Sequence, residues 1–306
     1  MKKKRINLIF LSITILVVGF LFLIDYNSKD ELLAVYLDNS RSDEIPSKSG
    51  NYVIDKIVCD DDVKASWDNI SWSLSVNNMN KKTKCNLYFK SKKDITITYD
   101  NNYTNNDIFS DTYYTGTMYT CCQTNSGDLY SVRDYTNGIY TFTRKPYAND
   151  TNDRGVFLPN KNKLTVGQKY YLRYVAKVAK NVSNTTFGSE QWGYSSPSLT
   201  SEWQTISYEF TATESEIVAF IFYDWWVKDS DNTLQVGNIF LQKGSYNNYS
   251  KVSLKEYGNL GNMSSPTRSG YTFLGWYTEA LGGTKVDENT IVTENTTYYA
   301  HWQYNG

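Results

Sequence analysis

Six residues in the second half of the chain have side chains suited to binding a small polar ring. They are the aromatic and acidic residues Trp192, Tyr194, Tyr223, Asp224, Trp225 and Trp226. A sugar presents an apolar face of C–H groups, on which aromatic rings stack, and a rim of hydroxyls that carboxylates and amides bind. Gln191 supplies such an amide beside the first tryptophan. We expect at least one of these rings to contact a carbohydrate.

The adjacent residues Trp225 and Trp226 are the strongest candidates for carbohydrate contact. On a strand, neighbouring side chains point to opposite faces, so at most one of the two rings lies in a core. The other is then exposed or lies in a loop. The alternative is that all of these rings fill the core of a large sandwich.

The acidic residues do not form a recognisable catalytic pair. A glycosidase needs two positioned carboxylates, and the spacing of Glu190, Glu202 and Asp224 pairs no two of them. His301 is the only histidine and lies beside Trp302, so a catalytic triad is not expected. The sequence holds no phosphate-binding loop, dinucleotide fingerprint or zinc motif. We predict a non-catalytic protein.

No cofactor is expected, with one possibility left open, a structural calcium ion. Asp231 and Asn232 carry the oxygen atoms that calcium prefers. The loop around them lacks the regular ligand spacing of a calcium site, so we predict no metal ligand.

The first 24 residues predict where the rest of the chain lies. Residues 2–5 carry four positive charges, and residues 6–24 form an uncharged run of 19 residues. A helix rises about 1.5 Å per residue, so this run spans close to the roughly 30 Å of a bilayer core. The basic segment 1–5 stays in the cytoplasm under the positive-inside rule. We predict a single-pass membrane protein with its bulk outside the cell.

A cleaved signal peptide is the competing interpretation of this segment. Its apolar region would run for about 7–15 residues and end in small residues. Here the run is longer and ends at Ile24 and Asp25 without such a site, which favours a retained anchor. Both interpretations export everything that follows.

The composition of the exported part favours β-structure. The chain has 27 Tyr, 8 Trp and only 5 Pro, and aromatic residues favour pleated sheets. The net charge of −1 offers no global field for nucleic acid, so we expect no nucleic-acid partner. A β-rich, surface-displayed protein is left as the main class.

Four cysteines in an exported protein indicate disulfide bonding. A bond between Cys59 and Cys85 would close a loop of residues 59–85 and stabilise it by about 3 kcal/mol in the chain-entropy model. Cys121 and Cys122 are adjacent, and two options stay open for them: a strained vicinal bond, or pairing of one of them elsewhere.

Beyond a linker at residues 25–33, we divide the chain into three modules with boundaries 34–91, 92–249 and 250–306. In the first, alternating patterns predict strands, and Trp67 and Trp72 are expected in its small core. In the second, residues 95–99 are expected to open the fold, and Asn137-Gly138 predicts a hairpin. The other predicted strands are 34–38, 52–58, 72–76, 84–89, 169–177, 202–212, 218–223 and 234–241.

Three motifs in residues 92–249 resemble those of jelly-roll carbohydrate-binding modules. They are Thr165-Val166-Gly167 with Tyr170, Glu202-Trp203-Gln204 with Phe210-Thr211-Ala212, and Val236-Gly237-Asn238-Ile239 with Leu241 and Lys243-Gly244. The resemblance implies a two-sheet β-sandwich and a glycan as ligand. Residues 101–153 match it poorly.

The C-terminal module resembles the Listeria–Bacteroides repeat, also called the internalin B-type repeat, a β-grasp-like module of bacterial surface proteins. The matching segments are 265–278, 282–286 and 297–302. Independently of the family, Tyr271 and Phe273 share one face of a strand.

Glycines explain the bends of this module. Gly270 and Gly275 permit a bend at each end of the strand, and Gly282-Gly283 predicts a turn. We expect Trp276, Tyr277 and Trp302 to pack as core.

Together these features predict a mostly β protein with an N-terminal transmembrane helix, a small disulfide-stapled domain, a jelly-roll sandwich and a β-grasp-like repeat. The expected function is non-catalytic glycan binding or adhesion at a bacterial surface, with a membrane and a glycan or host or cell-surface protein as partners. Two alternatives remain: a protein–protein adhesin and an envelope scaffold, neither of which binds sugar.

Overall fold

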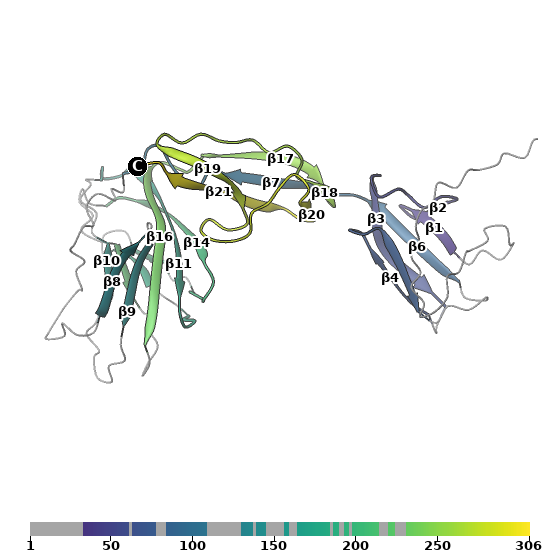
Figure 1. Ribbon diagram of the computed structural model, residues 1–306, viewed down its shortest axis with the longest axis horizontal. Helices are drawn as coiled ribbons and strands as arrows, with labels where there is room; N and C mark the ends of the chain where they lie inside the picture. The colour runs from purple at the N-terminus through teal and green to yellow at the C-terminus, as the bar shows by residue number, and fades with distance from the viewer. Residues whose placement is uncertain are drawn as a thin grey trace, which may run out of the picture. The chain divides into compact units, whose positions relative to one another are not determined.

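The computed structural model describes twelve ranges of the chain. They are residues 33–60, 63–77, 84–108, 130–136, 139–144, 156–158, 164–183, 186–189, 193–195, 198–213, 220–223 and 231–306. In these ranges the chain forms strands β1–β21 and no α-helix, which confirms the mostly β prediction (Figure 1).

The described ranges contain no helix of sufficient length and apolarity to cross a bilayer. The predicted span 6–24 lies outside them.

Contacts divide the chain into two compact units. The first unit ends its main segment at Thr96 and also holds Val252–Asn262 and Glu288–Thr296. The second unit consists of Ile97–Lys251, Met263–Asp287 and Thr297–Gly306.

The first unit contains a small sheet of order β2-β1-β6-β3 and a separate β4–β5 hairpin. Its strands are β1 (Leu33–Leu37), β2 (Ser40–Ser42), β3 (Tyr52–Cys59), β4 (Lys64–Asp68), β5 (Ser73–Asn77) and β6 (Cys85–Ser91). The β1–β6 pair is parallel and the other pairs are antiparallel. These strands confirm those predicted from alternation between residues 34 and 91.

The core of this sheet is apolar and aromatic. Leu87 and Phe89 of β6 are almost completely buried, and Trp72 is 7% exposed. The Trp67 ring packs edge-on against Trp72 and Phe89, at centroid distances of 5.2 and 5.4 Å. The prediction that Trp67 and Trp72 are core residues is confirmed for Trp72, while Trp67 is half-buried and packs against this core.

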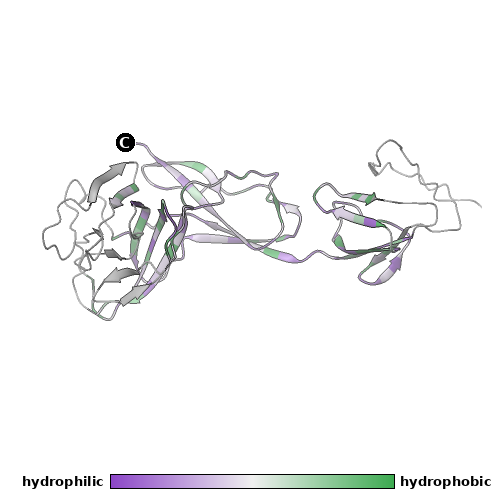
Figure 2. Cartoon of the chain, turned by 90° about the horizontal axis from the view of Figure 1, so that it is seen from below, coloured by the Kyte–Doolittle hydropathy of each residue, from purple (hydrophilic) through white to green (hydrophobic). Residues whose placement is uncertain are grey.

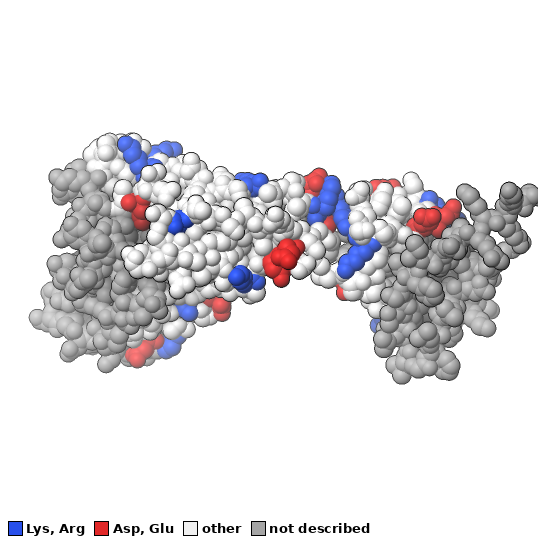
Figure 3. Space-filling view, turned by 45° about the horizontal axis from the view of Figure 1, so that its top comes forward, with Lys and Arg blue, Asp and Glu red and all other residues white. Residues whose placement is uncertain are grey.

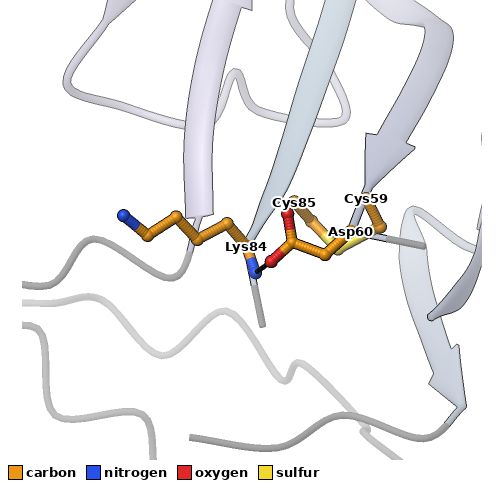
Figure 4. The surroundings of a disulfide bond; sticks show 4 residues. All are labelled: Cys59, Asp60, Lys84 and Cys85. Carbon is orange, nitrogen blue, oxygen red and sulfur yellow. Dashed lines mark hydrogen bonds between the residues drawn. A yellow bond between two sulfur atoms is a disulfide. The ribbon is translucent and has the colours of Figure 1, made fainter. Parts of the chain in front are cut away.

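A disulfide joins Cys59 at the end of β3 to Cys85 at the start of β6, as predicted (Figure 4). The two residues are paired across the strands. Beside them, Asp60 Oδ2 accepts a hydrogen bond of 2.7 Å from the backbone N–H of Lys84. The covalent bond therefore closes the open end of the β3–β6 ladder. The other two cysteines, Cys121 and Cys122, lie outside the described residues.

The second unit contains a two-sheet β-sandwich. One sheet has the order β14-β11-β16-β9-β8 and the other β10-β15-β12-β13. The strands are β8 (Tyr130–Thr136), β9 (Ile139–Arg144), β10 (Val156–Leu158), β11 (Lys169–Val178), β12 (Thr186–Ser189), β13 (Gly193–Ser195), β14 (Gln204–Thr211), β15 (Phe220–Tyr223) and β16 (Asn232–Lys243). The sandwich expected from the jelly-roll resemblance is present.

Long central strands carry the core of the larger sheet. On β11, Leu172, Tyr174 and Ala176 are at most 1% exposed, and on β16 Leu234 and Val236 are fully buried. Arg173 and Val175, at positions of the opposite face of β11, are each 1% exposed, so the centre of this strand is buried on both faces. Figure 2 shows hydrophobic residues, in green, within the described strands.

Turn chemistry matches the sequence expectations at two places. Thr136 pairs with Ile139, so β8 and β9 form the hairpin predicted around Asn137-Gly138. Before β11, Gly167 has φ of 78°, which a residue with a side chain rarely adopts. Gln168 N–H donates to Thr165 C=O (3.1 Å) and so closes this turn.

One strand belongs to a different sheet from the one we predicted. Residues 95–99 lie in β7 (Asp94–Asp100), which we expected to open the sandwich. Instead β7 lies in the order β17-β7-β21-β19, the sheet of the C-terminal repeat. The physical reason is packing, because Ile97 is fully buried and the Tyr99 ring lies 4.9 Å from Trp276. The three predicted module boundaries, 34–91, 92–249 and 250–306, stay predictions.

The remaining strands form the repeat. They are β17 (Tyr249–Lys255), β18 (Gly258–Asn259), β19 (Tyr271–Tyr277), β20 (Ile291–Val292) and β21 (Thr296–Tyr304). Gly275 has φ of 133° and lies where the β19–β21 register shifts, so the predicted bend is a β-bulge.

The aromatic core of the repeat is partly as predicted. Trp276 is 2% exposed, and its indole N–H donates to Ser264 C=O (2.8 Å). Phe273 packs against both Trp276 and Trp302, at 5.4 and 5.5 Å. Trp302 and Tyr277 are only half-buried, so they border the core of the repeat.

Candidate functional site

The backbone brings two of the six predicted sugar-binding residues onto one sheet. Tyr194 of β13 is opposite Gly188 of β12, and Tyr223 of β15 is opposite Thr186 of β12. Positions 186 and 188 are two residues apart on β12 and therefore share a face of the sheet. The register places Tyr194 and Tyr223 at positions of that same face. Trp192, Asp224, Trp225 and Trp226 lie outside the described residues.

A buried charged cluster around Arg173 occupies another part of the second unit. No sequence motif predicted it. Arg173 of β11 is 1% exposed. Its Nη1 donates to Asp100 Oδ2 (2.8 Å) and its Nη2 to Asn102 Oδ1 (3.0 Å). The guanidinium also lies over three aromatic rings, those of Phe240, Tyr246 and Tyr299.

The other members of this cluster connect the sandwich to the repeat. Asn102 Nδ2 donates to the carbonyls of Ala280 (2.8 Å) and Ala300 (3.0 Å), and Asn238 Nδ2 donates to Asn102 Oδ1 (2.7 Å). Asn102 has φ of 59°, a conformation that asparagine tolerates better than most residues. One side chain therefore links β16 of the sandwich to the backbone of the repeat.

Tyr246 completes the cluster. Its hydroxyl lies 2.6 Å from Asp100 Oδ1 and 3.0 Å from the carbonyl of Asn248. Burial, reinforced by the negative charge of Asp100, raises the pKa of Tyr246, so its hydroxyl stays protonated and can donate. Because Arg173 is nearly inaccessible, we assign the cluster a structural role.

A cavity of about 310 Å³ lies beside this cluster, within the second unit. Its walls come from the loop after β7, from β9 and β16, and from the repeat. The volume is at the lower end of the range for small-molecule sites. The side chains that define its chemistry are Thr104, Asp107, Asn238, Arg268, Leu274 and Trp302.

Arg268 lies in this cavity without a carboxylate partner. Its Cζ is 3.7 Å from the ring centroid of Tyr271 and 5.0 Å from that of Tyr103. Among the described residues, no hydrogen bond or ion pair engages its guanidinium group. The turn that holds it depends on Gly270, with φ of 76°, and Tyr271 N–H donates to Arg268 C=O (3.1 Å).

The only histidine also borders this cavity. His301 stacks on Tyr277 at 3.9 Å between ring centroids, and its Nε2 lies 2.8 Å from Glu279 C=O. Burial lowers the pKa of His301, and the hydrogen bond to Glu279 offsets this only in part.

The calcium candidates have other roles in the structure. Asn232 is 1% exposed, and its side chain bonds to the backbone of Lys180 through both Oδ1 (2.8 Å) and Nδ2 (3.1 Å). Among the described residues, no three His, Cys, Asp or Glu side chains gather as metal ligands would. Asp231 is exposed.

Charged residues are dispersed where they can be seen. On the face drawn in Figure 3, the described Lys, Arg, Asp and Glu side chains form small groups of both signs between wide uncharged areas. This dispersal accords with the net charge of −1.

Comparisons with known proteins confirm the C-terminal resemblance. The family model of the Listeria-Bacteroides repeat domain matches residues 239–301. No curated protein matches the chain. The matched segment begins within β16, so it includes only the end of that strand, residues 239–243.

Several solved structures are similar to part of the chain. One, described as "CBM4 structure and function", is 21% identical with a TM-score of 0.31, and 37% of this chain aligns with 89% of that one. The N-terminal cellulose-binding domain of Cellulomonas fimi β-1,4-glucanase C is 19% identical with a TM-score of 0.31, over 37% of this chain and 84% of that one. The second such domain of the same enzyme is 14% identical, with a TM-score of 0.30 over 47% and 94%.

Proposed function

We propose that this chain is a non-catalytic glycan-binding protein displayed at a bacterial cell surface. Residues 6–24 would anchor it, and the sandwich would bind the sugar for adhesion or substrate capture. The observation that carries the proposal is the register of β12, with Tyr194 and Tyr223 at positions of one face. Aromatic rings gathered on a sheet provide the apolar platform on which sugar rings stack.

Two further features support a binding role. The tryptophans Trp192, Trp225 and Trp226 adjoin β13 and β15 in the sequence, so more aromatic side chains are available near these strands. The resemblance of the C-terminal module to repeats of surface proteins agrees with display outside the cell.

A glycan array and affinity electrophoresis on the full chain test this proposal. We expect binding to at least one polysaccharide, and loss of that binding in Tyr194→Ala, Trp225→Ala or Trp226→Ala. Trp203→Ala is the matched control, because Trp203 precedes β14 in the other sheet and lies under the Lys177 ammonium at 4.8 Å. This control should bind as the unmodified chain does.

The outcome distinguishes the three candidate roles. If no glycan binds while all variants remain folded, the sugar proposal fails and a protein–protein adhesin becomes the leading function. If neither glycans nor surface proteins bind, an envelope scaffold remains. Protease treatment of intact cells tests display: an exported chain is cut, and a cytosolic one stays whole.

A further inference from the structure

We propose that the cavity around Arg268, here named the Arg268 cavity, binds the carboxylate of an acidic sugar, a hexuronic acid unit. This site is separate from the β12 sheet to which the glycan proposal refers. Its lining includes residues from the loop after β7, from β16, from the turn at Arg268 and from the start of β19.

The state of Arg268 points to an anion. Its guanidinium face is covered by Tyr271 at 3.7 Å, while no described residue bonds to its N–H groups. Stacking engages the faces of a guanidinium and leaves the edge donors free to pair with a planar anion. The two rings also restrict the side chain, so little further ordering is needed when a ligand binds.

The charge balance of the cavity favours a carboxylate over a phosphate. Among the described residues that line the cavity, Arg268 is the one cation, and Asp107 adds a negative charge. A phosphate carries up to about two negative charges at neutral pH. A single guanidinium matches a singly charged carboxylate, which it can bind through two parallel hydrogen bonds.

The remaining lining fits a hydroxyl-bearing ring. Leu274, which is 38% exposed, and the half-buried Trp302 ring provide apolar surface for C–H groups. Asn238 donates its Nδ2 to Asn102, and no described residue bonds to its Oδ1, so that oxygen can accept from a sugar hydroxyl. The Thr104 hydroxyl oxygen accepts from Asn106 N–H (3.2 Å), and its hydrogen can donate.

The test titrates the full chain with small matched probes, followed by NMR. The probes are the methyl glycosides of glucuronic, galacturonic and mannuronic acids, the corresponding neutral methyl glycosides, glucose 6-phosphate and N-acetylaspartate amide. We expect at least one uronide to bind, and to bind about tenfold or more tightly than its neutral counterpart, since hydrogen bonds to charged groups are the stronger ones.

Variants locate the site. Arg268→Gln should weaken uronide binding by about tenfold or more. Lys251→Gln is the matched control, because Lys251 also stacks on a tyrosine, with its Nζ 5.3 Å from the Tyr249 ring centroid, but does not line the cavity. Leu274→Glu should also reduce binding, since it places a like charge at an exposed position of the wall.

Each outcome decides the matter. Binding that is lost in Arg268→Gln and Leu274→Glu, and kept in Lys251→Gln and Tyr194→Ala, supports the proposal whether or not the β12 sheet binds sugar. The proposal is overturned if no uronide binds, if Arg268→Gln binds unchanged, or if glucose 6-phosphate or the aspartate amide binds as tightly as every uronide.

Discussion

Two ion pairs of nearly equal length lie in very different surroundings. In the second unit, Arg173 Nη1 is 2.8 Å from Asp100 Oδ2, and the two side chains are 2% and 12% exposed. In the first unit, Lys90 Nζ is 2.7 Å from Asp55 Oδ1, and the side chains are 46% and 44% exposed. Water and salt screen the exposed Lys90–Asp55 pair. The buried Arg173–Asp100 pair has exchanged its hydration for protein partners. Burial therefore decides what each pair contributes.

The same contrast extends to how each region is held together. The small sheet of the first unit combines an apolar core with a covalent bond between β3 and β6. In the second unit, residues from β7, β11 and β16 meet in a charged cluster whose members hydrogen-bond to one another. The disulfide acts mainly on the unfolded chain, while the charged cluster requires every member in place.

The largest effect is expected from Arg173→Ala. Asp100 would then be left buried without a counter-charge, and breaking such a pair costs about 3–5 kcal/mol of unfolding free energy. Urea denaturation of the full chain, followed by tryptophan fluorescence, measures the loss. A midpoint equal to that of the unmodified chain would show that the cluster contributes nothing to stability.

Replacement of both Cys59 and Cys85 by alanine should have the next largest effect. The two cysteines are 26 positions apart in the sequence. Loss of the bond between them is expected to lower the free energy of unfolding by about 3 kcal/mol. Hydrogen exchange of amides in β3 and β6 measures this loss locally. Amides of β11 and β16 serve as the internal control, and the contrast between the two regions breaks down if their protection falls as much.

Lys90→Ala should leave stability within experimental error. Its partner Asp55 is exposed, so solvent replaces the lost ion pair. The same urea experiment, run at low and at moderate salt, provides the measurement. A loss comparable to that of Arg173→Ala would refute the claim that burial separates the two pairs.

The last prediction concerns His301, a half-buried titratable group for which no described residue provides an ion pair. Burial lowers its pKa below the usual 6.5, so the folded state holds the ring neutral where the unfolded chain would protonate it. The resulting stabilisation is complete above pH 6.5 and is lost as the pH falls through the lowered pKa. As the only histidine, it gives a single set of imidazole NMR signals, whose midpoint should lie below 6.5.

Local patterns in the sequence predicted much of the fold. Alternation predicted the strands, Cys59 and Cys85 predicted the disulfide, and Asn137-Gly138 predicted the β8–β9 hairpin, all of which the structure confirms. Each of these features depends on residues close together in the sequence, or on an elementary rule of burial and turn geometry.

Such rules did not predict which sheet β7 joins, nor the charged cluster around Arg173. Ile95-Thr96-Ile97 alternates as any strand does, and its alternation does not say which sheet it joins. Arg173 and Asp100 are separated by 73 positions. The one sequence feature that could have indicated the buried cluster is Arg173, a single arginine in an aromatic strand. The same pattern is equally typical of an exposed charge.

By itself, the sequence determined that this chain is rich in strands, that two of its cysteines pair, and that its last module is similar to the Listeria–Bacteroides repeat. Only the tertiary structure decided that β7 lies in the sheet of that repeat, that Arg173 is buried against Asp100, and that Arg268 lines a cavity where no described residue bonds to its guanidinium group. The physical reason is that strand alternation and turns are local, whereas sheet partners and buried charges depend on which distant surfaces exclude water together.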